Sequence, residues 1–152
     1  MPPKPKFTKE EIIATALSVA REKGIDAITA REMGARLKVS TRPVFTYFQS
    51  IEELKQAVYV EAREMYRRYI YDGLAESLQP QSVGLQFIRF AQEEPWLYRL
   101  IYFSGTRFSE ENCVADAMYD LQEVVRPTLM KSYHMDENMA DQYYRSMWLV
   151  MN

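Results

Sequence analysis

The amino-acid sequence predicts an all-α protein, with a three-helix bundle at the N-terminus followed by a larger helical region. Apolar residues recur with a period of about 3.6 along most of the chain, and no run shows the period of two that marks a half-buried strand. In three places a Ser or Thr stands three positions before a glutamate, which is the pattern of a capping box at a helix start. These observations favour helices joined by short turns.

The first helix is expected from Thr8 to Lys23. Its apolar residues share one face: Ile12, Ile13, Ala16, Leu17 and Ala20. Thr8 and Glu11 form the first capping box, in which the hydroxyl and the carboxylate each satisfy a backbone N–H that lacks a helical partner. Gly24 follows the helix as a left-handed stop.

Three further helix starts follow closely. Thr29 and Glu32 open a short helix that runs to about Leu37, and Ser50 with Glu53 opens a longer one. Between them, Ser40 is expected to cap a short helix over Thr41–Tyr47. Pro43 fits the first turn of that helix, because N–H groups there have no helical partner. Two short helices joined by the tripeptide KVS predict a helix-turn-helix.

The remainder of the chain is predicted to be helical, with breaks near Pro80, at Pro95, over the loop 104–109 and near Pro127. A last helix is expected from Asp136. Its inner side is predicted to consist of Met139, Tyr143, Met147 and Val150. The pattern stops at Asn152 without a cap, which indicates a truncated chain or a natural terminus that packs against a partner. In the truncated case, Met147, Trp148, Leu149 and Met151 would be exposed apolar residues.

Composition argues against several classes of protein. Among 152 residues there is one cysteine, Cys113, and one histidine, His134, which excludes a disulfide framework and argues against a zinc site or histidine-based catalysis. Acidic pairs such as Glu93 with Glu94 are adjacent in sequence and do not share a helix face. Neither an enzyme nor a cofactor is expected. No stretch of 18 apolar residues occurs, and a cytoplasmic location is expected.

Charge is distributed unevenly along the chain. Residues 1–50 carry 9 Lys and Arg against 5 Asp and Glu, a net charge of +4, whereas residues 51–152 carry 10 against 16, a net charge of −6. A basic N-terminal third on an acidic remainder indicates that one end of the protein meets a polyanion. An excess of four charges also occurs by chance, so the pattern needs support from motifs.

The residues that supply this support run from Thr8 to about Val58. The segment ITAREMGARLKVSTRPVFTYFQSIEEL, with the preceding Gly24, resembles the DNA-binding domain of the TetR (tetracycline-repressor) family of bacterial transcriptional regulators. The resemblance implies a DNA-binding domain over residues 1–50 and a helical effector-binding and dimerisation domain over residues 51–152. Beyond residue 58 the chain is similar to the family only in being helical and in the pattern around residues 95–103.

In a helix-turn-helix the second helix lies in the major groove, and its first residues reach base edges. Arg42 is the leading candidate for a base contact, because a guanidinium pairs with guanine through two hydrogen bonds. By resemblance, Tyr47 and Thr29 would bind phosphates, as would the free N–H groups of the helix beginning at Ile51. The full set of expected DNA-binding residues is Thr29, Ser40, Thr41, Arg42, Pro43, Phe45, Thr46, Tyr47, Ile51 and Lys55.

The sequence departs from the family at two of these positions. Phe45 stands where tyrosine is usual, and Ile51 stands where lysine is frequent, so two phosphate contacts are missing. Lys55 is expected to replace the lost lysine, and Lys4, Lys6 and Lys9 could form a basic arm. Val44 and Phe48 are predicted to be core residues, whereas Phe45 fits either the core or the DNA.

Aromatic residues concentrate in the second domain, which holds 16 of the 20 in the chain. Buried tyrosines need hydrogen-bond partners, so a helical domain rich in them suits a mostly apolar cavity with a few polar groups. By resemblance this cavity would hold a small, mostly apolar effector. The expected wall residues are Phe87, Phe90, Trp96, Tyr102, Met118 and Tyr119, and the alternative for each is a simple core position.

Together these features predict a DNA-binding regulator, and the family resemblance implies a homodimeric repressor that a small effector releases from a palindromic operator. The family dimerises through its last two helices, and two half-sites one turn apart require a dimer. The alternative is a protein of the same fold that binds a protein partner and no longer binds DNA. The substitutions at Phe45 and Ile51 give that alternative its weight.

Overall fold

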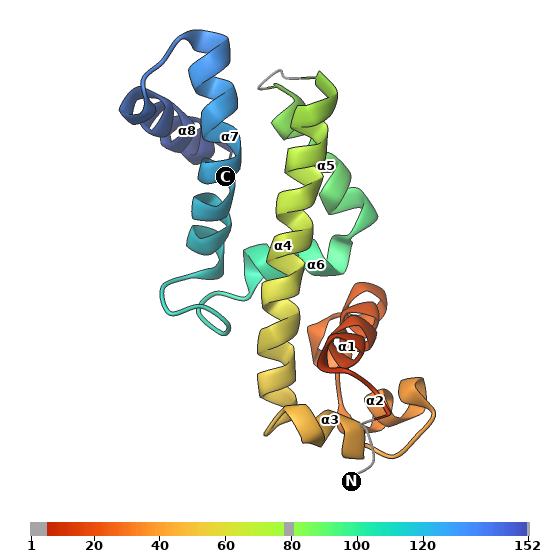
Figure 1. Ribbon diagram of the computed structural model, residues 1–152. Helices are drawn as coiled ribbons and strands as arrows, with labels where there is room; N and C mark the ends of the chain where they lie inside the picture. The colour runs from red at the N-terminus through yellow and green to blue at the C-terminus, as the bar shows by residue number, and fades with distance from the viewer. Residues whose placement is uncertain (1–5, 78–80, 152) are drawn as a thin grey trace, which may run out of the picture. The chain divides into compact units, whose positions relative to one another are not determined.

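The computed structural model describes residues 6–77 and 81–151, and its regular elements in these ranges are helices without any strand (Figure 1). The predicted all-α class is confirmed. The chain divides into two compact units, Met1–Ala62 and Arg63–Asn152. The division falls inside helix α4 (Ile51–Ser77), because the first three turns of this helix belong to the first unit.

The first unit consists of α1 (Lys9–Lys23), the 3₁₀ turn η1 (Ile25–Ala27), α2 (Ala30–Leu37), α3 (Arg42–Tyr47) and the start of α4. The predicted capping box of α1 is confirmed. The Thr8 N–H donates to Glu11 Oε2 at 2.7 Å, and the Glu11 N–H donates to Thr8 Oγ1 at 3.1 Å. Gly24 ends α1 with φ of 90° and ψ of 165°, a positive φ but not the left-handed helical conformation that was predicted.

The other two predicted capping boxes are half formed. Thr29 Oγ1 accepts the N–H of Glu32 at 3.1 Å, and Ser50 Oγ accepts the N–H of Glu53 at 3.1 Å. The reciprocal bonds are replaced, since the Glu32 carboxylate accepts from Arg36 and the Glu53 carboxylate accepts the Gln49 N–H at 2.6 Å. The hydroxyls therefore set the helix starts, as predicted, while the glutamates bind elsewhere.

The turn between α2 and α3 is tight. Lys38 adopts the left-handed conformation at φ of 53°, and the Val39 N–H donates to the Gly34 carbonyl at 3.3 Å. The predicted capping by Ser40 is wrong, because Thr41 is the N-cap residue and its side chain makes no capping bond. The N–H groups of Val44 and Phe45 donate to the Thr41 carbonyl, so the first turn needs no hydroxyl.

The core of the first unit is mainly aliphatic. Every helix contributes fully buried side chains, which are Ile12, Ala16 and Val19 of α1, Met33 of α2, Val44 of α3, and Leu54 and Val58 of α4. The turns at Ile28 and Phe48 close this core. Burial of one face of each short helix holds the helix-turn-helix together, since helices of six to eight residues are marginal alone.

The second unit contains the rest of α4 with α5 (Gln81–Glu93), α6 (Pro95–Phe103), α7 (Cys113–Tyr133) and α8 (Glu137–Met151). Consecutive helices from α5 to α8 pack against one another. The predicted helix start at Pro95 is confirmed. The start near Asp136 is also confirmed, because Asp136 Oδ1 accepts the Met139 N–H at 2.8 Å. The predicted break at Pro80 lies outside the described residues.

Helix α7 does not end near Pro127, as the sequence predicted, but continues through it to Tyr133. A proline inside a helix removes one backbone hydrogen bond and costs roughly 3 kcal/mol relative to alanine. Val125 and Leu129 flank the proline and are fully buried, so one apolar face continues across it. Packing of that face, which includes contacts with α8, outweighs the local cost.

The predicted inner side of α8 is also wrong. Met139, Tyr143 and Val150 are 54%, 41% and 88% exposed, respectively, and Met147 is half-buried. The buried stripe lies one residue further along, at Ala140, Tyr144 and Trp148, which recur every four residues. Both stripes are apolar, so periodicity alone did not show which of them faces the unit's own core.

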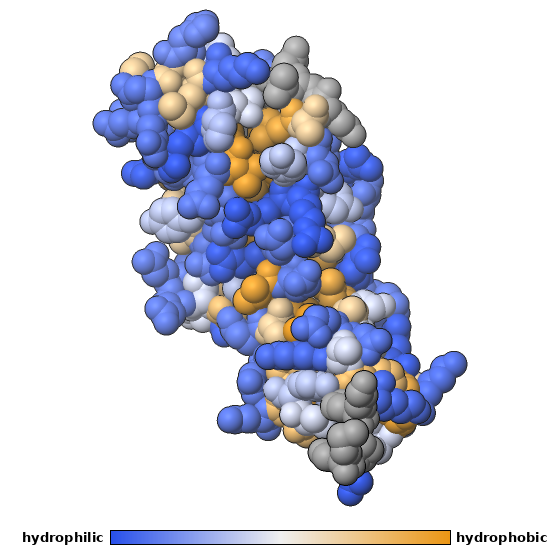
Figure 2. Space-filling view, viewed as in Figure 1, coloured by the Kyte–Doolittle hydropathy of each residue, from blue (hydrophilic) through white to orange (hydrophobic). Residues whose placement is uncertain are grey.

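Helix α7 begins at the only cysteine of the chain. Cys113 is fully buried, and its N–H donates to the carbonyl of Gly105 at 2.8 Å, which ties the 104–112 loop to the helix start. Figure 2 shows that hydrophilic residues cover most of the visible surface of this unit, with hydrophobic residues gathered between α4 and α7. Among the described residues, no helix is both long enough and apolar enough to span a bilayer.

Candidate nucleic-acid interface

Helix α3 has one buried side and one open side. Val44 and Phe48 are buried, at 0% and 3% exposure, which confirms their predicted core positions. The opposite side presents Arg42 and Thr46, both exposed, and Phe45, which is 47% exposed. Phe45 therefore belongs to the surface of the unit and not to its core.

The residues before and at the start of α3 lie at the surface or partly covered. Ser40 is exposed, while Thr41 and Pro43 are half-buried. The methyl group of Thr41 lies 3.5 Å from where a side chain on Gly34 would begin, so it packs over α2. Of these residues, Ser40 is the most accessible to a partner.

The hydroxyl groups of Thr29 and Thr46 differ in whether their proton is available for a hydrogen bond to a partner. Thr29 Oγ1 accepts the Glu32 N–H, so its own proton stays available for a phosphate oxygen. Thr46 Oγ1 donates to the Arg42 carbonyl at 3.1 Å, so its proton is engaged within the helix. Thr46 then offers mainly its methyl group, which suits contact with a thymine methyl.

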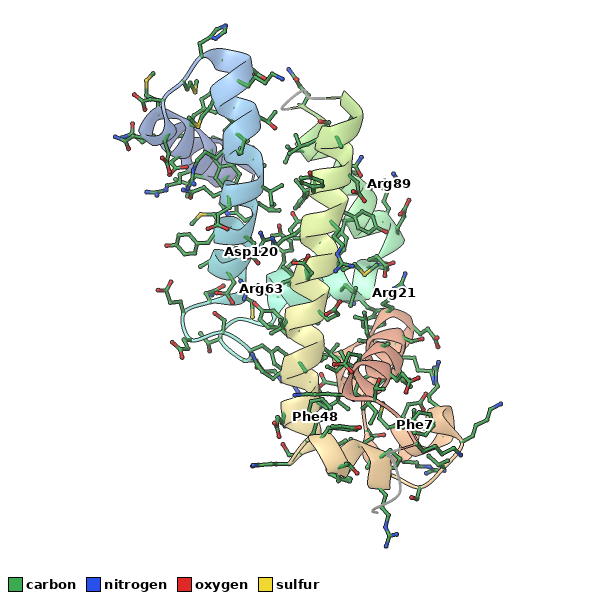
Figure 3. The ribbon with its side chains drawn as sticks, viewed as in Figure 1. Phe7, Arg21, Phe48, Arg63, Arg89 and Asp120 are labelled. Atoms are coloured by element: carbon green, nitrogen blue, oxygen red, sulfur yellow. The ribbon has the colours of Figure 1, made fainter. Side chains whose placement is uncertain are left out.

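Tyr47, at the end of α3, is bound to the N-terminal segment. Its hydroxyl donates to the backbone carbonyl of Phe7 at 2.8 Å, across 40 positions of sequence. Figure 3 labels Phe7, which precedes α1, and Phe48, the residue after Tyr47. The ammonium of Lys9 lies 5.3 Å from the centre of the Phe48 ring, within the range of a cation–π contact. Neither of these contacts was predicted from the sequence.

In and around the helix-turn-helix, from α2 to α3, three exposed cations have no carboxylate partner among the residues described. They are Arg31 at the start of α2, Lys38 in the turn and Arg42 at the start of α3. Sequence reasoning identified only Arg42. A signal that could have identified Arg31 and Lys38 was present in the sequence. Neither residue has an acidic residue three or four positions away that could pair with it on the same helix face.

Arg36 is occupied within the unit. Its guanidinium donates to Glu22 at 3.0 Å and to Glu32 at 3.0 Å, and Lys23 also reaches Glu32 at 3.2 Å. The hydrogen bond from Arg36 lowers the pKa of Glu22 to about 2. These charges hold α1 against α2, so the positive charge available to a polyanion comes from the residues outside this cluster.

The expectation that Lys55 replaces the missing lysine at position 51 stays a prediction, and the surroundings of Lys55 do not favour it. It is buried to 7% exposure, and its ammonium pairs with Glu52 at 2.8 Å and with Asp26 at 3.6 Å. Ile51 begins α4 and is half-buried, with Glu52 and Glu53 in the same first turn. These carboxylates oppose an anion at the helix start, so the phosphate contact at Ile51 stays a prediction.

The second unit contains a cluster of aromatic rings around α4, α5 and α6. Tyr66 lies 4.7 Å from Phe90, and the hydroxyls of Tyr66 and Tyr102 form a buried hydrogen bond of 2.8 Å. Phe87 and Trp148 contact the Tyr102 ring at 5.7 and 6.1 Å. Burial raises the pKa of both Tyr66 and Tyr102 well above its usual value, so their hydroxyls stay neutral.

The six expected wall residues fall into separate places. Phe87, Phe90 and Tyr102 belong to the aromatic cluster, and Trp96 is 39% exposed beneath Arg99. Tyr119 is exposed and lines an open hollow of about 390 Å³ with Arg63 and Glu110. Met118 is half-buried on α7. An effector site that uses all six stays a prediction.

The first unit has the architecture of a helix-turn-helix DNA-binding domain, with α2, a tight turn and an open α3. Residues 12–58 match the model of the bacterial regulatory proteins of the tetR family. This segment is thus similar to the DNA-binding domain of that family, which supports a role of the protein as a DNA-binding transcriptional regulator. Neither the curated proteins nor the solved structures contain a match to the chain.

Proposed function

We propose that the protein reads double-stranded DNA through the open side of α3 and that Arg42 makes the principal base contact. The observation that carries this proposal is the exposure of Arg42 at the first position of α3 without an acidic partner among the described residues. A guanidinium at this position suits the two acceptors of a guanine in the major groove. Phe45 and the Thr46 methyl group add apolar surface for thymine methyls.

The test is DNA binding with sequences selected from a random pool by the full chain. Arg42→Ala should weaken binding to the selected site about tenfold to a hundredfold, because a good bidentate pair contributes roughly 1–3 kcal/mol. Arg68→Ala is the matched control, since Arg68 is also an exposed arginine but lies on α4 in the second unit. Equal losses for the two variants would contradict base reading by Arg42.

The alternative function, a co-regulator that no longer binds DNA, gives a different result. Wild-type protein should bind DNA with an affinity that falls steeply as salt rises, because phosphate contacts release counterions. Absence of binding at low salt would favour the co-regulator. The exposed Arg31 and Lys38 favour DNA binding, since a face that had lost this role has no need of unpaired cations.

We further propose that the protein is a repressor released by a small, mostly apolar effector held in the second unit. Tyr144 supports this proposal, because its hydroxyl is buried and has no hydrogen-bond partner in the described residues. Such groups are uncommon in folded proteins and call for a ligand or an ordered water. An effector with one polar group would pair with Tyr144 while its apolar part contacts aromatic rings.

An effector acts by binding one state of the protein better than the other, which shifts the population between them. A compound screen for thermal stabilisation would find candidates, because a ligand stabilises the state it binds. A true effector should also release the selected DNA, and Tyr144→Phe should weaken its binding. Stabilising compounds that leave DNA affinity unchanged would contradict release by an effector.

We propose a homodimer formed through the last two helices. The exposed apolar side chains of this region support it: Tyr133, Met139, Tyr143, Leu149 and Val150. Of the residues expected to be exposed in a shortened helix, Leu149 is 80% exposed, Met147 is half-buried and Trp148 is buried, while the Met151 side chain is outside the described set. Leu149→Asp should shift the protein from dimer to monomer in sedimentation experiments, and an unchanged mass would contradict this interface.

A further inference from the structure

The turn that joins α2 to α3 places a lysine in a backbone conformation that lysine rarely adopts. Lys38 ends α2 with φ of 53° and ψ of 35°, in the left-handed region. Residues other than Gly, Asn, Asp and His are uncommon there, because the Cβ atom crowds the following carbonyl oxygen. Among the described residues other than glycine, His134 is the only further one with a positive φ. Lysine at position 38 is therefore the less expected of the two.

Hydrogen bonds of the turn impose this conformation on position 38. The Val39 N–H donates to the Gly34 carbonyl at 3.3 Å, and the Lys38 N–H donates to the Ala35 carbonyl at 3.3 Å. Paired bonds of this kind end many helices, and glycine is the residue that adopts the conformation without steric cost. A residue that conflicts with its local geometry is characteristic of functional sites. The lysine side chain thus points to a role outside the turn.

The side chain of Lys38 is available to a partner. It is exposed and makes no hydrogen bond or ion pair with any residue that the structure describes. The carboxylates of Glu22 and Glu32 in the same unit are occupied by Arg36 and Lys23. The positive charge of Lys38 is therefore not used to hold the unit together.

The place of Lys38 in the helix-turn-helix indicates which part of the DNA it meets. The second helix of this motif enters the major groove, whereas the first helix crosses the sugar-phosphate backbone. Lys38 lies at the end of the first of these helices, α2, and four positions before Arg42, the first residue of α3. A lysine presents a compact charge on a flexible stem, which suits a phosphate better than a base edge.

We propose that Lys38 binds a backbone phosphate of the DNA where α2 crosses it, and that lysine occupies the left-handed position for this contact at a cost to the stability of the fold. This inference rests on the proposed DNA-binding function. It adds a phosphate contact from the turn to the base contact of Arg42. A phosphate contact fixes the register of the protein on the duplex and carries no sequence information of its own.

The first experiment measures DNA affinity over a range of salt concentrations, with the full chain and a site selected from random DNA. Lys38→Gln should reduce the slope of log affinity against log salt by about 0.9 for each bound copy of the chain. If the variants converge at about 1 M salt, this difference amounts to about eightfold weaker binding per copy at about 0.1 M.

Two comparisons sharpen this measurement. The loss in Lys38→Gln should be the same on the selected site and on a scrambled one, because a phosphate contact acts uniformly across sequences. Lys38→Arg keeps the charge and should keep the slope. Arg68→Gln is the matched control for loss of an exposed charge, since Arg68 lies on α4 in the second unit, and it should leave the slope unchanged.

The second experiment, thermal unfolding, separates this role from a purely structural one. Lys38→Gly relieves the left-handed strain, so it should raise the melting temperature by about 2–4 °C while it reduces the salt slope as Lys38→Gln does. A residue that only ends α2 would not combine a gain in stability with a loss of DNA affinity. His134→Gly relieves the same strain in the second unit and should raise the melting temperature without changing the slope.

The outcomes that contradict the proposal are distinct from failure of the underlying function. A wild-type salt slope in both Lys38→Gln and Lys38→Gly would overturn the phosphate contact. A lower melting temperature in Lys38→Gly would overturn the proposed cost to stability, because the lysine would then serve the fold. If the wild-type chain binds no DNA even at low salt, DNA binding itself is refuted. If Arg42→Ala weakens binding while the Lys38 variants do not, only the present inference fails.

Discussion

Each unit of the protein sets an arginine between two carboxylates, and the two clusters differ in how far water reaches them. In the first unit Arg36 binds Glu22 and Glu32, whose side chains are 50% and 26% exposed. In the second unit Arg63 binds Asp116 and Asp120, which are 23% and 16% exposed (Figure 3). Exposed pairs contribute little to stability because water and salt screen them, whereas partly buried hydrogen-bonded pairs contribute more.

The hydrophobic interiors differ in the same direction. The first unit is closed mainly by aliphatic side chains on short helices, and the second by aromatic rings with buried hydroxyls. A small aliphatic core is sufficient to hold the short helices of the first unit together while one side of α3 stays exposed. The second unit carries the larger and more polar interior, so its stability depends on specific contacts that single substitutions can remove.

The largest expected effect is that of Phe90→Ala in the aromatic cluster. Phe90 is fully buried, with the rings of Tyr66 and Tyr69 at 4.7 and 5.1 Å. Removing the ring should lower the free energy of unfolding of the second unit by about 3–5 kcal/mol, measured by urea unfolding. Leu85→Ala, at an exposed position on the same helix, should cost less than about 0.5 kcal/mol. A similar small loss at Phe90 would contradict the described packing.

The next largest expected effect is that of removing the charge of Asp120, which tests whether the partly buried ion pair with Arg63 contributes more to stability than an exposed pair. Arg63 donates two hydrogen bonds to Asp120, at 2.7 and 3.0 Å, so Asp120→Asn should cost about 1.5–3 kcal/mol. Glu64→Gln is the control, because Glu64 pairs with Arg68 on the exposed side of α4 and should cost roughly 0.3–0.5 kcal/mol. A double-mutant cycle of Asp120→Asn with Arg63→Met measures the coupling, and a value near zero would refute the contrast.

Pro127→Ala should stabilise the second unit. The alanine restores a backbone donor inside α7, although the unfolded chain gains freedom when proline is lost. The expected net gain is about 1–2 kcal/mol in urea unfolding, with an increase in helical circular dichroism. Destabilisation would show that the proline shapes α7 in a way its neighbours require.

The smallest effect concerns acid stability of the first unit. Arg36 holds the pKa of Glu22 at about 2 in the folded protein, below its ordinary value of 4.5. The stabilisation by Glu22 is therefore complete above pH 4.5 and is lost as the pH falls toward 2. Glu22→Gln should flatten part of the decline in urea midpoint between pH 5 and 3. An unchanged decline would mean that the exposed pair contributes nothing measurable.

Sequence reasoning succeeded where the signal is local. The hydroxyl caps at Thr8, Thr29 and Ser50 and the buried pair Val44 and Phe48 were predicted, because spacing along one helix determines them. The helix-turn-helix followed from these starts and from the short turn. The exposure of the opposite side of α3, with Arg42 and Thr46, was predictable for the same reason.

Predictions failed where a distant residue decides. Lys55 was expected to be an exposed cation, but it is buried and pairs with the neighbouring Glu52 and with Asp26, which lies 29 positions earlier. The bond from Tyr47 to Phe7 spans 40 positions and leaves no trace in either local pattern. In α8 two apolar stripes compete, and only packing against the other helices of the unit selects the one through Tyr144. The periodicity of a sequence identifies an apolar helix face, but it does not identify which other helices pack against that face.

The burial of Cys113 provides a built-in reporter for the opening of the second unit. Its thiol is the only one in the chain and is inaccessible in the folded unit, so a thiol reagent can react only when the start of α7 separates from its neighbours. At high reagent concentration the labelling rate becomes the opening rate itself, and at low concentration it reports the equilibrium between closed and open forms. One native atom, without any introduced probe, thus gives both the kinetics and the energy of local unfolding.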